Sequence, residues 1–182
     1  MILWKVYLFL TVRETVLLLV GGMDLPDSLC HTFGTLGTGG LPTKNASIGY
    51  HNSVYIDTAV TVFMLIGGAN FALHIQLVRG SPLVMRRDPE FRFYLGVFVA
   101  FSIVSTVNLY GAAYESFGKT LRHSSFQFAS IMTTTGYATA DFEMWPGLAE
   151  IILVLCMFIG SSVSSMGGGM KRMRMIGLKM IG

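Results

Sequence analysis

The stretch Thr133-Thr134-Thr135-Gly136-Tyr137-Ala138-Thr139-Ala140-Asp141 sets a run of hydroxyl side chains and one glycine between two strongly apolar segments. A backbone that is not helical cannot satisfy its polar groups in lipid. At membrane depth such a run must therefore be covered by protein or line a watery path. The stretch predicts a membrane protein that builds a pore for ions, and the rest of the chain is interpreted around it.

The composition also indicates an integral membrane protein. Of the 182 residues, 52% are hydrophobic and 13% are charged, and the mean hydropathy is +0.59. These values are too apolar for a soluble domain of this length. The net charge is only +3, and the basic residues cluster beside apolar segments, where they set topology. We therefore expect lipid and not nucleic acid as a partner.

Four apolar segments have the length of a spanning helix, which needs roughly 20 residues. They cover residues 2–22, 53–78, 93–114 and 147–165. One basic cluster lies in the short loop 79–92 and the other follows the last segment. The positive-inside rule places both clusters in the cytoplasm and the glycine loops outside.

The first apolar segment is interrupted by Arg13 and Glu14. Insertion scales put a charge at the centre of a spanning helix at about 2.5–3.5 kcal/mol, so both side chains should face protein or water. A polar contact inside the helix bundle and a snorkelling pair both satisfy this requirement, and we favour the snorkelling pair.

Each half of the chain contains a short helix followed by a Thr-Gly loop. Residues 24–36 and 124–132 are too short to span, and Gly37-Thr38-Gly39-Gly40-Leu41-Pro42-Thr43 follows the first of them. Both halves then share one plan: spanning helix, short re-entrant helix, loop, spanning helix. Because both halves enter from the same side, we interpret them as parallel repeats, which are typical of pores and transporters.

Aligning Gly39 with Gly136 pairs Thr38 with Thr135 and Gly37 with Thr134. A dehydrated cation needs oxygen atoms in place of its water shell, and backbone carbonyls supply them if the chain is aimed inward. Glycine permits such a backbone. The preceding short helix directs the partial negative charge of its C-terminus toward the same point.

At these residues the sequence resembles the Trk/Ktr/HKT superfamily of cation transporters, and most closely the bacterial TrkH potassium uptake subunits. The resemblance covers nearly the whole chain. Three motifs carry it: Gly37-Thr38-Gly39-Gly40-Leu41-Pro42-Thr43-Lys44-Asn45-Ala46-Ser47, the opening stretch, and Gly167-Gly168-Gly169-Met170-Lys171.

The resemblance implies an all-α membrane protein in which four helix–pore loop–helix repeats of one chain surround a single selectivity filter. This sequence is similar to the second and third repeats, half of such a pore, with about four spanning helices and two short pore helices. Residues 1–78 would form one repeat, residues 79–92 a cytoplasmic basic loop, and residues 93–182 the other repeat with a glycine-rich intramembrane gate loop and a basic cytoplasmic end.

By the same resemblance, backbone carbonyls line the filter. The ion-binding residues it implies are Gly37, Thr38, Gly39, Thr134, Thr135 and Gly136, with Thr38 and Thr135 as potassium ligands mainly through their carbonyls. Gly167, Gly168 and Gly169 would form the gate loop below the filter.

The function that the resemblance implies is potassium uptake across the bacterial inner membrane by a multi-pass protein that is not an enzyme. Potassium is then the transported ion, and no organic cofactor is expected. The implied partners are the first and fourth repeats, a second copy in a homodimer, and a cytoplasmic NAD- or nucleotide-binding regulatory subunit similar to TrkA. With two repeats instead of four, we expect a fragment, a truncated reading frame or one half of an assembly.

Three alternatives stay open from the residues alone. The first is a sodium or mixed-cation transporter of the same superfamily. The second is a non-conducting membrane fragment whose glycines serve helix packing, and the third is half of a pore that two copies of the chain complete. An enzyme is the weakest interpretation, because the serines of residues 161–165 lack a Gly-x-Ser-x-Gly elbow.

Overall fold

The computed structural model describes residues 2–78, 80, 87–141 and 145–159. Within these residues the chain is all-helical, as predicted, and contains no β-strand. The α-helices are α1 (Ile2–Val20), α2 (Leu25–Leu36), α3 (Val54–Gly67), α4 (Phe71–Val78), α6 (Pro89–Leu109), α7 (Phe117–Met132) and α8 (Gly147–Ile159). A 3-10 helix, η1 (Ser47–His51), precedes α3.

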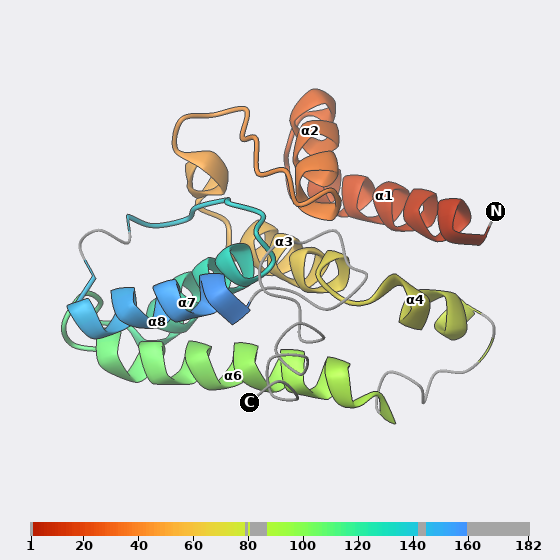
Figure 1. Ribbon diagram of the computed structural model, residues 1–182. Helices are drawn as coiled ribbons and strands as arrows, with labels where there is room; N and C mark the ends of the chain where they lie inside the picture. Colours follow the sequence, from red (N-terminus) through yellow and green to blue (C-terminus); the bar gives the residue numbers. More distant parts are fainter. Residues whose placement is uncertain (1, 79, 81–86, 142–144, 160–182) are drawn as a thin grey trace.

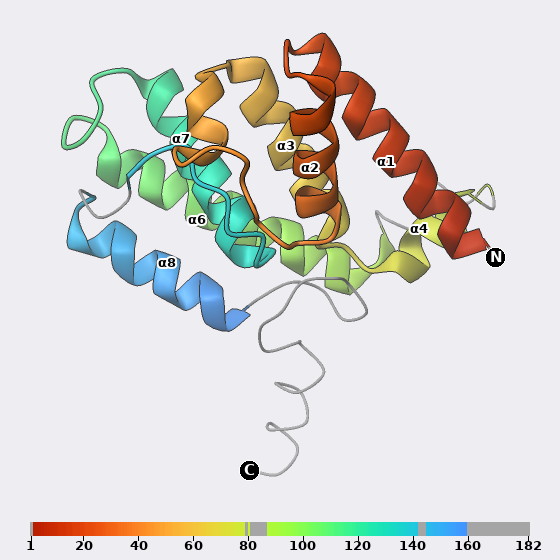
Figure 2. The same ribbon diagram turned by 90° about the horizontal axis from the view of Figure 1, so that it is seen from above.

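The helices form two groups that meet in the middle of the molecule (Figure 1). In the first group α1 packs on α2 and α3, and in the second α6 packs on α7 and α8. The groups join where α3 lies against α7, which Figure 2 shows from above. One core cluster spans both groups: Leu18, Met23, Ile48, Ile56, Val60, Met64, Phe126, Ala129 and Tyr137.

The predicted spanning segments differ in how they fold. Among the described residues, α6 is long and apolar enough to cross a membrane by itself. Residues 53–78 form two helices, α3 and α4, bent by 97°. The last segment forms α8, which is described as far as Ile159.

The bend after α3 occurs where its end approaches both short helices. A Cβ atom at Gly67 would lie 3.4 Å from the carbonyl oxygen of Leu36, the last residue of α2. A Cβ atom at Gly68 would lie 2.7 Å from Cγ2 of Thr133, the residue that caps α7. The amide of Ala72 then donates to Asn70 Oδ1 at 2.9 Å as α4 begins. Small residues therefore end the helix where neighbouring backbone and side-chain atoms leave little room for a Cβ, a feature that hydropathy alone does not indicate.

Arg13 and Glu14 do not behave as a snorkelling pair. The Arg13 guanidinium is exposed and lies 5.3 Å from the centroid of the Phe9 ring. Glu14 is fully buried, and neither carboxyl oxygen has a hydrogen-bond partner among the described residues. The favoured interpretation is thus wrong for Glu14, because consecutive helical residues point in directions about 100° apart.

Candidate functional site

The loop 37–40, which contains the predicted filter residues 37–39, leaves the C-terminus of α2 through two left-handed residues. Thr38 has φ +49° and Gly40 has φ +55°. The amide of Thr38 donates to the Thr35 carbonyl at 3.2 Å. The amides of Gly39 and Gly40 both donate to the carbonyl of Gly34, at 2.8 and 3.4 Å. The loop is thus tied to the last turn of its own helix.

The second loop, residues 133–136, leaves α7 with the same geometry. Thr134 has φ +58° and Gly136 has φ +84°. The amide of Thr134 donates to the Ile131 carbonyl at 3.0 Å, and the amides of Thr135 and Gly136 donate to the Ser130 carbonyl at 2.8 and 3.4 Å. The two loops therefore share both their hydrogen bonds and the positions of their left-handed residues.

This match corrects the pairing expected from the sequence by one residue. Gly40 corresponds to Gly136, and Thr38 corresponds to Thr134. The same register pairs Gly37 with Thr133 and Gly39 with Thr135. It also pairs two fully buried serines, Ser28 in α2 and Ser124 in α7. The sequence pairing had matched Gly39 with Gly136, because a run of glycines does not reveal which member has a positive φ.

Two features of the loops had no signal in the sequence. The Thr133 hydroxyl donates to the Ala129 carbonyl at 2.7 Å and lies 2.7 Å from the Thr135 hydroxyl, so both hydroxyls are bonded within the protein. Thr38 and Thr134 hold left-handed conformations at a cost of roughly 1–2 kcal/mol each. Strain of this kind persists where the surroundings impose it, often at functional sites.

The two loops lie side by side in the middle of the molecule (Figure 2). A Cβ atom at Gly40 would overlap the carbonyl oxygen of Thr135, so the loops approach each other through their backbones. Beyond the loops, the amide of Gly49 donates to the Ala138 carbonyl at 3.1 Å, and the amide of Ala138 donates to Ser47 Oγ at 3.2 Å. A cavity of about 330 Å³ lies there, lined by Asn45, Ala46, Ser47, Gly49, Ala138, Thr139, Ala140 and Asp141.

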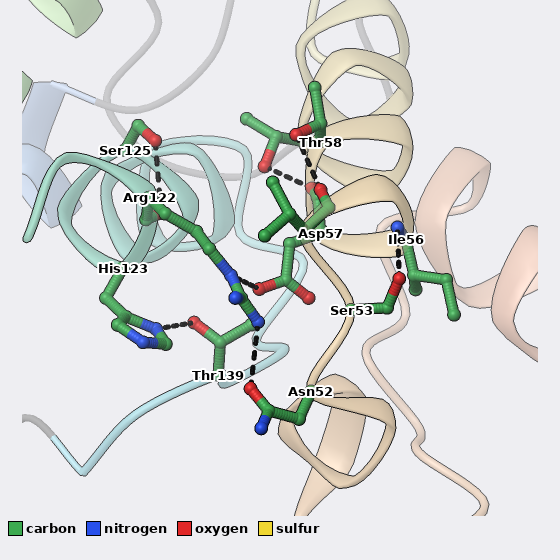
Figure 3. A network of polar contacts seen from close by, with 11 residues as sticks. Asn52, Ser53, Ile56, Asp57, Thr58, Arg122, His123, Ser125 and Thr139 are labelled. Carbon is green, nitrogen blue, oxygen red and sulfur yellow. Dashed lines mark hydrogen bonds and ion pairs between the residues drawn. The ribbon is translucent and has the colours of Figure 1, made fainter. Parts of the chain in front are cut away.

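Helix α7 begins earlier than the predicted short segment 124–132, and its extra turns carry a buried ion pair (Figure 3). Arg122 Nε lies 2.6 Å from Asp57 Oδ2 of α3, and the two side chains are only 14% and 2% exposed. The same guanidinium donates to Asn52 Oδ1 at 3.3 Å. One residue on, the His123 ring lies 3.2 Å from the Thr139 hydroxyl. The two contacts of Arg122 fasten the second short helix to the other half of the chain.

His31 lies buried in α2 near the first loop. Its Nε2 atom is 3.4 Å from the Thr43 hydroxyl, and its ring centroid is 6.2 Å from that of His51. Burial lowers the pKa of His31, the electrostatic effect of the neighbouring His51 lowers it further, and Asp27 partly offsets both effects. The imidazole is therefore held in its neutral form.

Other expected site residues fall outside the described part of the chain. The predicted gate residues Gly167, Gly168 and Gly169 lie there, as do residues 79 and 81–86 of the basic loop. Within the described residues, no group of three or more His, Cys, Asp or Glu side chains is placed to hold a metal ion. A cation bound among these residues would depend on backbone and hydroxyl oxygens.

Comparison with known proteins gives one consistent result. The sequence model of the TrkH family, described as "Cation transport protein", matches residues 1–180. The chain is 39% identical over 176 residues to the Trk system potassium uptake protein TrkH of Escherichia coli K12, covering 96% of this chain and 36% of that protein. It is 31% identical over 175 residues to the Trk system potassium uptake protein TrkG of the same organism, again covering 96% and 36%.

The crystal structure of the potassium transporter TrkH from Vibrio parahaemolyticus has the same fold. The two structures superpose with a TM-score of 0.91 at 36% identity, over 97% of this chain and 39% of that one. The chain thus spans little more than a third of the length of the relatives it matches.

Proposed function

The chain belongs to the TrkH family of cation transport proteins, and from this premise we propose that it supplies two neighbouring walls of a potassium-selective pore. The observation that carries the proposal is the matched pair of loops after α2 and α7. They repeat one another in hydrogen bonding and in left-handed residues, and they touch through Gly40 and Thr135. Ion filters are built from rings of backbone carbonyls, and transporters place their sites where internal repeats meet, so a repeated loop shape at the contact between two halves supports this proposal.

Backbone carbonyls of residues 38–40 and 134–136 are the proposed ligands. The Thr133 and Thr135 hydroxyls bond each other, and the Thr133 hydroxyl also donates to the Ala129 carbonyl, so contacts within the protein hold both side chains in place. Both short helices end at their loops, and the partial negative charge of a helix C-terminus favours a cation there. On the register of the two loops, we propose Gly40 as a filter residue in addition to the predicted ones, with Gly37 at the edge of the filter.

The exposure of Leu41 supports further repeats as partners. Leu41 occupies the position in the first loop that Tyr137 occupies in the second, yet Leu41 is 80% exposed whereas Tyr137 is 2% exposed. Tyr137 is buried because it packs against α2 of the neighbouring half. We propose that Leu41 packs in the same manner against the short helix of another repeat, carried by the same chain in the longer relatives.

The remaining parts of the proposal follow from family membership. The protein would sit in the bacterial inner membrane with the loops outside and the basic segments in the cytoplasm. A second copy and a nucleotide-binding regulatory subunit similar to TrkA would complete the system.

Potassium uptake tests the proposal directly. The chain is expressed alone and, in parallel, as a chimera in which it replaces the matching 176 residues of Escherichia coli TrkH, in a strain that lacks potassium uptake. We expect the chimera to restore growth at low potassium and to take up rubidium. Gly96→Ala in the chimera should transport normally, because nothing lies within 4 Å of a Cβ atom at Gly96, and it serves as the control for the loop glycine variants discussed below.

The proposal fails if the chimera reaches the membrane in normal amounts yet transports neither potassium nor rubidium. Preferential uptake of sodium would instead favour the sodium-transporting alternative. Uptake by the chain alone would show that copies of the chain complete the pore.

A further inference from the structure

Tyr137 connects the second loop to the short helix of the other half. It follows Gly136 directly and is 2% exposed. Its hydroxyl donates to the main-chain carbonyl of His31 in α2 at 3.2 Å. Its ring meets the His31 ring edge-on, with 5.3 Å between the centroids. A residue adjoining one loop is thus anchored 106 positions away in the sequence.

Gly34 provides the space for this hydroxyl. A Cβ atom at Gly34 would overlap the Tyr137 hydroxyl and would lie 3.0 Å from Cζ of the ring. Gly34 in α2 corresponds to Ser130 in α7, since each carbonyl accepts the two amides of its own loop. The Ser130 hydroxyl donates to the Tyr137 carbonyl at 2.6 Å. Two equivalent helix positions therefore act on Tyr137. Ser130 bonds its carbonyl, and Gly34, which has no side chain, leaves room for its hydroxyl.

The phenol remains a hydrogen-bond donor throughout the physiological pH range. Burial is the largest of the effects that raise the pKa of Tyr137. The hydroxyl proton is therefore always present for the His31 carbonyl. No change of pH near neutrality releases this contact through the tyrosine itself.

We propose that Tyr137 is a positioning residue for ion selection, which fixes the spacing between the two loops by anchoring the second loop on α2. This inference rests on the proposed function. Selection between potassium and sodium depends on the number and placement of the carbonyls around the ion, whichever account of selectivity is adopted. Without the anchor, the carbonyls of the second loop can move toward the smaller ion.

The first test removes only the hydroxyl. Tyr137→Phe is compared with Tyr110→Phe, a control at an exposed tyrosine that packs on Phe117, in the chimera described above. We expect Tyr137→Phe to keep potassium uptake but to lower the ratio of potassium to sodium uptake about five- to tenfold, the effect of one lost hydrogen bond. The control should keep the ratio of the unmodified protein.

The second test asks whether Gly34 and Tyr137 act on each other. Gly34→Ala should lower the thermal midpoint of the purified protein in detergent, because the new methyl group collides with the hydroxyl. Adding Tyr137→Phe removes the colliding atom, so the double variant should be more stable than Gly34→Ala by roughly 3 °C or more. Such rescue distinguishes a specific contact from a general loss of packing.

Two results would overturn the inference: a double variant no more stable than Gly34→Ala, or a Tyr137→Phe protein that transports with an unchanged ion ratio. Absence of uptake by the unmodified chimera would instead reject the proposed function. The two failures are therefore separable.

Discussion

Replacing Gly40 with alanine is expected to damage the protein far more than the same change at its neighbour Gly39. Gly40 has φ +55°, a conformation that costs an L-residue roughly 1–2 kcal/mol. The new Cβ atom would also overlap the Thr135 carbonyl oxygen and lie 3.3 Å from the Gly136 Cα atom. These neighbours are all main-chain atoms, which no change of rotamer can move aside. Overpacking of this kind adds typically about 1–3 kcal/mol.

The expected loss of unfolding free energy for Gly40→Ala is therefore about 2–5 kcal/mol. At Gly39 no atom lies within 4 Å of an ideal Cβ, and its φ is not positive, so alanine there is tolerated. Gly136→Ala falls between them, because φ is +84° but the surroundings are open. The three glycines thus have a predicted order of sensitivity.

Thermal unfolding in detergent and rubidium uptake measure this order. We expect the midpoint of Gly40→Ala to fall by at least about 5 °C and its uptake to fall at least tenfold. Gly39→Ala should remain within about 2 °C of the unmodified protein, since its stability changes by less than about 1 kcal/mol. If Gly39→Ala abolished uptake while Gly40→Ala transported normally, the register of the two loops derived from the structure would be refuted.

Two further predictions concern charges near the loops. Arg122→Gln should destabilise the protein by about 3–5 kcal/mol, because it leaves the buried Asp57 carboxylate unpaired. Asp57→Asn should cost less unfolding free energy, since the arginine is more exposed. A double-mutant cycle measured by thermal or denaturant unfolding tests this pair, and additive effects of the two substitutions would contradict the prediction. Burial and His51 lower the pKa of His31 in the folded protein from its ordinary 6.5. The folded state is therefore most stable, with respect to this group, above pH 6.5. Stability is lost as the pH falls from 6.5 toward the lower folded-state pKa, because the unfolded chain binds the proton more readily. Thermal midpoints measured from pH 7.5 to 5.5 should therefore decline, and less steeply in His31→Gln; an equal decline would show that His31 is not the cause. The pKa of His123 is also lowered, by burial and by neighbouring positive charge, so His123→Gln is the next variant to measure.

The ion pair between Arg122 and Asp57 is decided by the tertiary structure. Residues 119–123 lie in the first turns of α7, where the partly buried Arg122 side chain lies 2.6 Å from Asp57 of α3. A charged residue whose partner lies 65 positions away appears in the sequence only as a polar residue.

The sequence by itself determined the features that depend on neighbours along the chain. Apolar composition and segment length predicted an all-helical membrane protein, and the Thr-Gly motifs indicated both the family and two short helices that each end in a glycine loop. Hydropathy, helix length and the positions of glycines depend on residues that are close together in the sequence, so they can be assessed without knowledge of the fold. The filter and gate roles of the loop residues remain predictions.

Only the tertiary structure decided which glycine corresponds to Gly136 and where the long apolar segment bends. A positive φ at Gly40 and the approach of its Cα to Thr135 arise from contact between two halves of the chain. The same is true of the space at Gly34 that receives the Tyr137 hydroxyl. The sign of φ at one glycine and a contact between distant residues cannot be recognised in the sequence, because any glycine in a short run satisfies the same local pattern.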